Sequence, residues 1–170
     1  MAGMIAWTRH RLASARKLAY DRTARLFARE RKMDHSSPAA LPTLISLLLC
    51  DQVIDDRMTN KKSAIGLFNT IVVNSTPARL PHLAVMATLT EIGSRTPLEL
   101  RLVSDADNDT LISTHGAVEA PNPLAMVDLV FAMQGVQIPR PGQYAFELHA
   151  GDHILGRRRF HVLRAQRKEQ

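Results

Sequence analysis

From residue 43 onward, short hydrophobic or alternating segments are separated by turn-forming residues. The segments span about 43–54, 64–74, 82–92, 97–104, 110–118, 125–137, 143–149 and 153–163. Their lengths and regular spacing are typical of strands joined by turns. The pattern predicts an all-β domain, an antiparallel eight-stranded β-sandwich of immunoglobulin-like or jelly-roll-like type.

Alternation is clearest in segments 98–102 and 144–148, where every second residue is hydrophobic. Because successive side chains of a strand point to opposite faces, these hydrophobic residues share one sheet face. We expect that face to form the core. The aromatic residues predicted to lie in it are Phe68, Tyr144, Phe146 and Phe160.

Segments 44–50 and 126–133 are hydrophobic at nearly every position. Such runs predict strands that are covered on both faces or that begin beneath the N-terminal extension, residues 1–33. Cys50, the single cysteine, ends the first run, so we expect a buried and unreactive thiol with no internal disulfide. This cysteine usage, together with the lack of a secretion signal, predicts a reducing compartment and a cytoplasmic location.

The N-terminal residues differ in composition from the rest of the chain. Residues 1–33 hold nine Lys or Arg against two acidic residues, and 7–32 lack proline and glycine, which predicts a basic helical extension. Residues 34–42 form a linker, 43–163 the β-sandwich domain and 164–170 a basic tail. The extension could lie on a membrane, contact RNA, dock on its own domain, target an organelle, or have no independent role.

The charge of the chain is unevenly distributed. Its formal net charge is +6, yet residues 1–33 contribute +7 and residues 34–156 contribute −6. The domain therefore lacks the excess of positive charge that nucleic-acid binding requires, and nucleic acid is expected only at the basic N-terminal extension, residues 1–33. No run of about 18 apolar residues is present, so we predict a soluble chain without a transmembrane segment.

Two groups of residues have metal-ligand character. Asp105, Asp107 and Asp109 alternate as at the start of a calcium loop, but the glycine and glutamate that complete such a loop are missing, and a hairpin turn explains them as well. His149 and His153 flank a short hairpin turn, which would place the two imidazoles opposite each other and near enough to share Zn²⁺. A third ligand would have to come from Asp152 or Glu147, and exposed polar residues are the alternative.

A charged loop is predicted after the first strand. The residues Asp51, Asp55, Asp56, Lys61 and Lys62 could hold a polar ligand or partner, or could simply be solvated. Cys50 has no nearby positive charge, no serine lies in a nucleophile motif, and no glycine-rich phosphate loop occurs. The sequence therefore predicts no catalytic residue and no cofactor.

Three stretches carry a resemblance to a known family. They are the apolar strand ending in Cys50-Asp51, the segment Ile65-Gly-Leu-Phe-Asn-Thr-Ile71, and Ile138-Pro-Arg-Pro-Gly-Gln-Tyr-Ala-Phe146. Together they make residues 44–163 resemble a family of small bacterial β-sandwich proteins classed as a domain of unknown function. The resemblance implies the fold and implies nothing about catalysis.

From these observations we expect a non-enzymatic binding or protein-interaction module that presents its loops to an unknown protein or small-ligand partner. The alternative is a carbohydrate- or metal-dependent ligand-binding β-sandwich, and an enzyme of unknown type is a third hypothesis.

Overall fold

The computed structural model describes residues 41–93 and 95–166. The predicted helix at 1–33, most of the linker and residues 167–170 lie outside the described residues. The described part is all-β, with nine strands and no helix, so none of it forms a helix that could cross a membrane. The strands are β1 (Thr43–Asp56), β2 (Lys61–Leu67), β3 (Thr70–Val73), β4 (Ala78–Thr90), β5 (Thr96–Ser104), β6 (Thr110–Val118), β7 (Val127–Ile138), β8 (Gly142–Ala150) and β9 (His153–Arg164).

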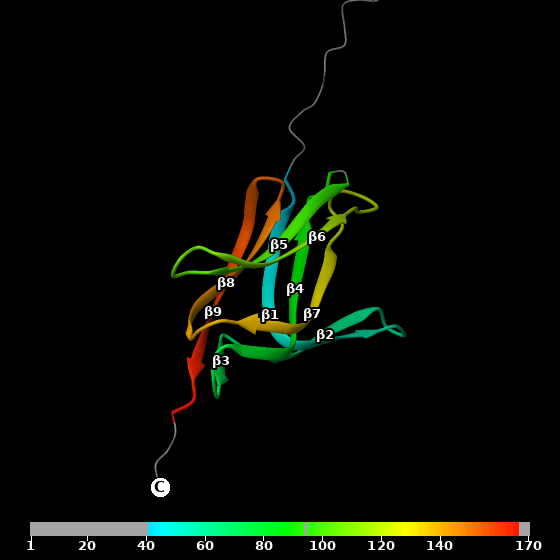
Figure 1. The fold of residues 1–170 in the computed structure, drawn as a ribbon. Coiled ribbons are helices and arrows are strands. Elements are labelled where there is room, and N and C mark those ends of the chain that lie inside the picture. The colour runs from blue at the N-terminus through cyan, green and yellow to red at the C-terminus, as the bar shows by residue number, and fades with distance from the viewer. Residues whose placement is uncertain (1–40, 94, 167–170) are drawn as a thin grey trace, which may run out of the picture. The chain divides into compact units, whose positions relative to one another are not determined.

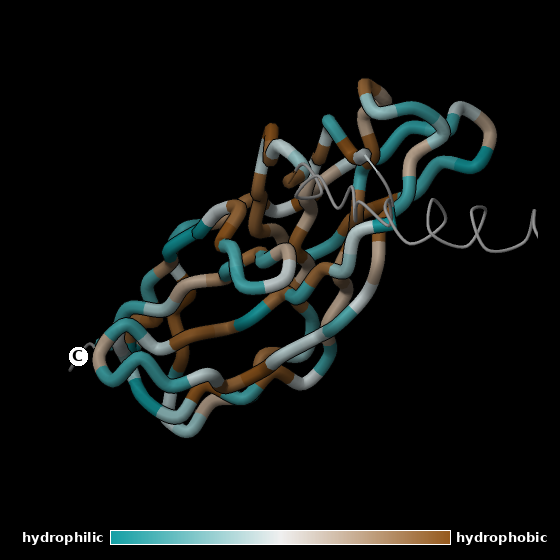
Figure 2. The backbone as a smooth tube through the Cα atoms, turned by 90° about the horizontal axis from the view of Figure 1, so that it is seen from above, coloured by the Kyte–Doolittle hydropathy of each residue, from teal (hydrophilic) through white to brown (hydrophobic). Residues whose placement is uncertain are grey.

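The strands form two sheets (Figure 1). The four-stranded sheet has the order β2-β1-β4-β7, and the five-stranded sheet has the order β3-β9-β8-β5-β6. Neighbouring strands are antiparallel except β3 and β9, which are parallel. Hydrophobic and hydrophilic segments alternate along the strands (Figure 2). Buried residues from both sheets belong to one hydrophobic core.

The strand count of the prediction was wrong because segment 64–74 is two strands in different sheets. Its first half, β2, pairs with β1, whereas its second half, β3, pairs with β9. Gly66 has a φ of +69°, a conformation that glycine adopts without strain, and Phe68 and Asn69 carry the chain across to the other sheet. Hydrophobic residues lie on both sides of the crossover, with only Asn69 and Thr70 between them, so the pattern resembles that of a single strand.

The predicted aromatic core is largely confirmed. Tyr144, Phe146 and Phe160 are fully buried, and the ring of Phe160 stacks on those of Tyr144 and Phe146 at centroid distances of 5.9 and 5.8 Å. Phe68 meets Phe160 edge to face but is only partly buried. The Tyr144 hydroxyl donates a hydrogen bond to the Arg140 carbonyl at 2.7 Å, which anchors the start of β8 to the preceding turn.

Of the two alternatives for the all-apolar strands, coverage on both faces was wrong, and a start beneath the N-terminal extension involves residues outside the described part of the chain. In β1 only the neighbours Leu49 and Cys50 are buried, one on each face. In β7 burial alternates because one face packs against the core and the other is exposed. The Cys50 thiol is buried as predicted. Its pKa is raised mainly by this burial and, to a lesser extent, by the nearby negative charge of Asp51. β9 ends at Arg164, one residue beyond the predicted domain boundary.

Candidate binding site

A gap opens in the four-stranded sheet where β1 and β4 separate. Their ladder ends at the pair Cys50–Ala84. Beyond that pair β1 continues with β2, and Figure 1 shows this hairpin projecting away from the other strands. β4 continues with β7 instead. Asp51 and His82, next to the fork, therefore keep a neighbouring strand on one side only, β2 for Asp51 and β7 for His82, and the ladder between β1 and β4 does not reach them.

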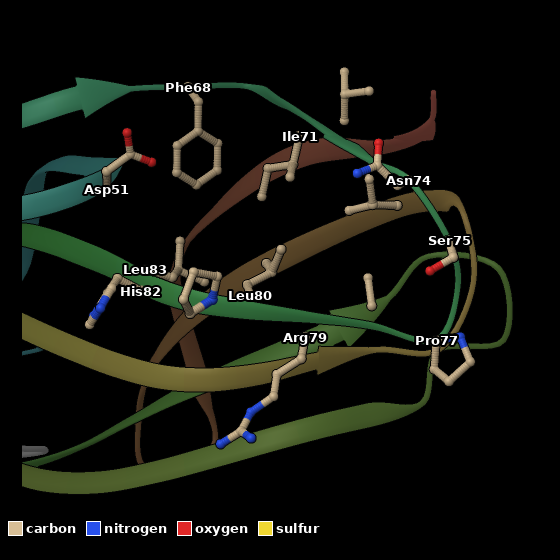
Figure 3. Close-up of a pocket in the computed structure, with 14 residues that line it drawn as sticks. Asp51, Phe68, Ile71, Asn74, Ser75, Pro77, Arg79, Leu80, His82 and Leu83 are labelled. Carbon is tan, nitrogen blue, oxygen red and sulfur yellow. The ribbon is translucent and has the colours of Figure 1, made fainter. Parts of the chain in front are cut away.

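A trough of about 500 Å³ lies at this gap, between the crossover that leads into β3 and the start of β4. Its walls carry the apolar side chains of Phe68, Ile71, Leu80 and Leu83. Figure 3 shows Asp51 at one end and Asn74 and Ser75 at the other, while Arg79 extends away over a neighbouring strand. The trough thus has apolar walls and polar ends. Phe68 is only partly buried because it forms one of these walls.

Asp51 owes its position to a glycine. A Cβ added to Gly66 would lie 2.2 Å from Asp51 Oδ2, so the carboxylate packs directly on the backbone of β2. Among the described residues no ion pair involves Asp51. Its carboxylate is therefore available to a ligand in the trough. A second hollow of about 460 Å³ shares Asp51, His82 and Leu83 and opens on the outer face of the same sheet.

The five charged residues predicted around a loop do not form one site. Asp55 and Asp56 belong to β1 and pair across the ladder with Lys62 and Lys61, so the predicted loop is a strand hairpin. The Lys62 ammonium lies 3.6 Å from Asp55. Hydrogen bonds from Thr59 and then from the Met58 amide lower the pKa of Asp56, as in an ordinary turn. Only Asp51 of the five faces the trough.

The three aspartates of the β5–β6 turn do not converge on a common point. Asp105 accepts hydrogen bonds from Arg157 and Arg159. Asp107 is bound by Arg140, and a hydrogen bond from Ser104, followed by that of Arg140, lowers its pKa. Within 41–93 and 95–166 no group of three or more His, Cys, Asp or Glu side chains is arranged to hold a metal ion.

The two histidines of the last hairpin are not opposite each other. A register shift between Leu148 and His149 pairs His149 with Ile154 and His153 with Ala150. His149 is also buried rather than exposed, with Nε2 3.1 Å from Glu147 Oε2.

Glu147 and His149 are both buried because they lie on β8, the central strand of the five-stranded sheet. Arg101 of β5 and Arg157 of β9 flank Glu147 in the ladder, and Arg157 Nε lies 3.2 Å from Glu147 Oε1. The charges on this outer face of the five-stranded sheet therefore neutralise one another. They form a network within the protein rather than an open site.

Glu99 extends this network toward the edge of the five-stranded sheet. Arg101 donates two hydrogen bonds to its carboxylate, at 2.8 and 2.6 Å, and Ser113 donates a third. The hydrogen bonds from Arg101, and to a lesser extent that from Ser113, lower the pKa of Glu99 to about 2. The Glu99 carboxylate therefore stays charged in the folded protein at acidic pH.

We expect the stabilising effect of Glu99 to depend on pH. An unfolded glutamate has a pKa of about 4.3, so the contribution is full above that pH and is lost as the pH falls toward 2. Thermal unfolding of the wild type and Glu99→Gln between neutral pH and pH 2 measures it. The wild type should be more stable at neutral pH, and the difference should shrink on acidification. A difference that does not change with pH would contradict this assignment.

The trough itself was not predicted, because its residues carry no motif. The lining residues lie within 68–83, apart from Asp51, and they meet because β2 and β3 belong to different sheets. The one available signal is the glycine in the run Ile65–Ile71, which lies within the single strand predicted at 64–74.

Comparison with curated proteins finds no match. Among solved structures, an alkylpurine DNA glycosylase from Pseudomonas fluorescens bound to DNA with an abasic site analogue is 8% identical, with a TM-score of 0.39. That match covers 69% of this chain and 30% of the glycosylase. A β-glucosidase from Listeria innocua in complex with isofagomine is 8% identical with a TM-score of 0.38, over 73% of this chain and 16% of that one. This chain thus spans less than a third of either, and neither likeness supports an argument about function.

The sequence of residues 45–163 matches a protein family, and the match runs from the beginning of β1 almost to the end of β9. The resemblance to a family of unknown function is therefore confirmed over nearly the same residues. The chain belongs to this family, which is described as a family of unknown function (DUF6941).

Proposed function

We propose that this chain is a non-enzymatic protein-interaction module whose trough binds an extended segment of a partner protein. The size of the trough, about 500 Å³, falls within the usual range for ligand sites. Apolar walls with a few polar groups at the ends are also typical of such sites. They supply burial and orientation for a bound segment.

The observation that carries the proposal is the position of β3. This strand is the last in the five-stranded sheet, and within the described residues no strand pairs with its outer edge. Ile71, Val72 and Val73 of β3 also line the trough. An extended segment could therefore form main-chain hydrogen bonds with β3 while its side chains enter the trough, which is the strand-addition mode of peptide recognition.

The ends of the trough indicate what the segment should contain. Asp51 has no ion-pair partner among the described side chains, so a basic residue at that end would gain a charge-assisted hydrogen bond. Between the two ends of the trough, Leu80 and Leu83 offer apolar surface to the side chains of the bound segment. We infer a segment that combines apolar side chains with one lysine or arginine.

A random peptide library displayed on phage and selected against the full chain tests this function. Val72→Trp places a large side chain at a position that lines the trough and is 63% exposed, so it should block binding without unfolding the protein. Ile154→Trp, at a 56% exposed position of β9 outside the trough, is the matched control.

Selected peptides should bind the wild type and Ile154→Trp alike and should lose at least about tenfold in affinity for Val72→Trp, a change of about 1.4 kcal/mol. Equal binding to all three proteins, or no enrichment at all, would contradict the proposal.

We also propose that the fold is of the immunoglobulin-like type rather than a jelly roll. The orders β1-β4-β7 and β9-β8-β5 correspond to strands A-B-E and G-F-C of an immunoglobulin domain. The bond from the Tyr144 hydroxyl to the Arg140 carbonyl supports this, because such domains place a tyrosine corner at the start of strand F. The buried, unpaired Cys50 is consistent with the proposed cytoplasmic location.

A further inference from the structure

Among the described residues, β7 has a strand partner on one side only. β7 ends the four-stranded sheet opposite β2, and no strand in the described part of the chain covers it. Proteins normally protect a long edge strand with lysine, proline or a covering segment. Residues 127–134 contain no lysine, arginine or proline, and Asp128 is their only charge. This edge is therefore open to pairing with another strand.

The outer face of the same sheet carries an apolar band that reaches β7. The register aligns Leu48, Met86 and Val130 in one row across β1, β4 and β7. The next row aligns Leu67, Cys50, Ala84 and Ala132 across all four strands. Along the strands, the band is followed by polar side chains, where the Thr88 hydroxyl donates a hydrogen bond to Asp128 at 2.7 Å. Across the sheet, the band reaches the open edge at Val130 and Ala132, which are exposed.

The inner face of β7 is also incompletely covered. Leu129, Phe131 and Met133 pack against the core but remain partly exposed, unlike the buried inner residues of β4 such as Val85 and Ala87. A further strand beside β7 would cover these three side chains. It would also extend the apolar band on the other face.

The side chains of β7 are arranged symmetrically in polarity about Phe131. Moving outward from it, Val130 and Ala132 are small and apolar, Leu129 and Met133 are large and apolar, and Asp128 and Gln134 are polar. An antiparallel strand that pairs about a two-fold axis at Phe131 brings each residue opposite its counterpart in this pattern. The strand with this sequence is β7 itself.

We propose that a second copy of this chain pairs with β7, antiparallel and with the two Phe131 residues opposite each other. Val130 of one copy then faces Ala132 of the other, and Asp128 faces Gln134, so the apolar bands join and no like charges meet. Gly135, with a φ of +66° and the Arg79 guanidinium against it, interrupts the extended backbone of β7 just beyond Gln134. The pairing therefore spans residues 128–134 and does not involve the trough-lining strand β3.

Sedimentation equilibrium of the full chain tests the proposal. The wild type should reach twice the 18.9 kDa of one chain as its concentration rises. Val130→Lys introduces a charge that edge strands use to prevent pairing and should leave a folded monomer. Ile65→Lys, on the other edge strand at a 47% exposed position, is the control and should still dimerise. A wild type that stays monomeric at all concentrations, or equal dissociation by both variants, would overturn the proposal.

Cysteine cross-linking tests the register in a Cys50→Ala background. Opposite residues have Cβ atoms close enough for a disulfide, whereas residues two positions out of register do not. Val130→Cys and Ala132→Cys chains should each fail to cross-link alone and should cross-link when mixed. Cross-linking of either variant with itself but not with the other would exclude the axis at Phe131.

Discussion

Replacing Phe146 with alanine is expected to lower the free energy of unfolding by about 3–5 kcal/mol. The side chain is completely buried, and its ring stacks on Phe160 at 5.8 Å. The loss combines the transfer of an aromatic side chain out of water with the cavity that it leaves between the two sheets. Urea denaturation followed by circular dichroism measures it.

The matched control for Phe146→Ala is Leu163→Ala on the neighbouring strand β9. Leu163 is 51% exposed, so its truncation should change stability by only about 0.5 kcal/mol. A cost below about 1 kcal/mol for Phe146→Ala would mean that the ring does not lie in the core as described.

Replacing Gly156 with valine is expected to cost about 1–3 kcal/mol, because the two sheets approach closely there. A Cβ on Gly156 would lie 2.2 Å from Leu44 Cδ2, a side chain of β1 in the opposite sheet. Gly156 pairs with the buried residue Leu148, so its hydrogen points into the core. The added methyl groups therefore have to displace Leu44.

A double-mutant cycle separates this collision from other effects of valine. Leu44→Ala removes the side chain that is struck, so Leu44→Ala with Gly156→Val should be less destabilised than the sum of the two single variants, by about 0.5–1.5 kcal/mol. Strictly additive losses would show that Leu44 is not the obstacle.

Much of the fold could be predicted from the sequence because hydrophobic periodicity reports directly on sheet faces. Leu98, Leu100 and Leu102 are buried as their alternation indicated, and segment 110–118 corresponds to β6 at both ends. A continuous hydrophobic run does not always mean that a strand is buried on both faces, and there the prediction fails. The run at 126–133 is apolar because β7 carries core residues on one face and the exposed apolar band on the other.

The candidate site was less predictable because it depends on which strands become neighbours. Asp51 was singled out as part of a charged loop, yet the structure separates it from Asp55 and Lys62 and places it at the end of the trough. The burial of His149 likewise follows from its place on a central strand and from a register shift that no local pattern signals. Charge and spacing in the sequence identified polar residues that a binding site could use, but not the side chains that they contact in the fold.

The most direct test of the proposed function is to map where a selected peptide binds, using amide chemical shifts of the isotope-labelled full chain. Binding in the trough predicts the largest shifts, and slowed amide exchange, in β3 and at the start of β4, with Asp51 also affected. The same titration with Val72→Trp should show no shifts at these residues. Shifts confined to β7 or to the β5–β6 turn, with β3 unchanged, would contradict the account.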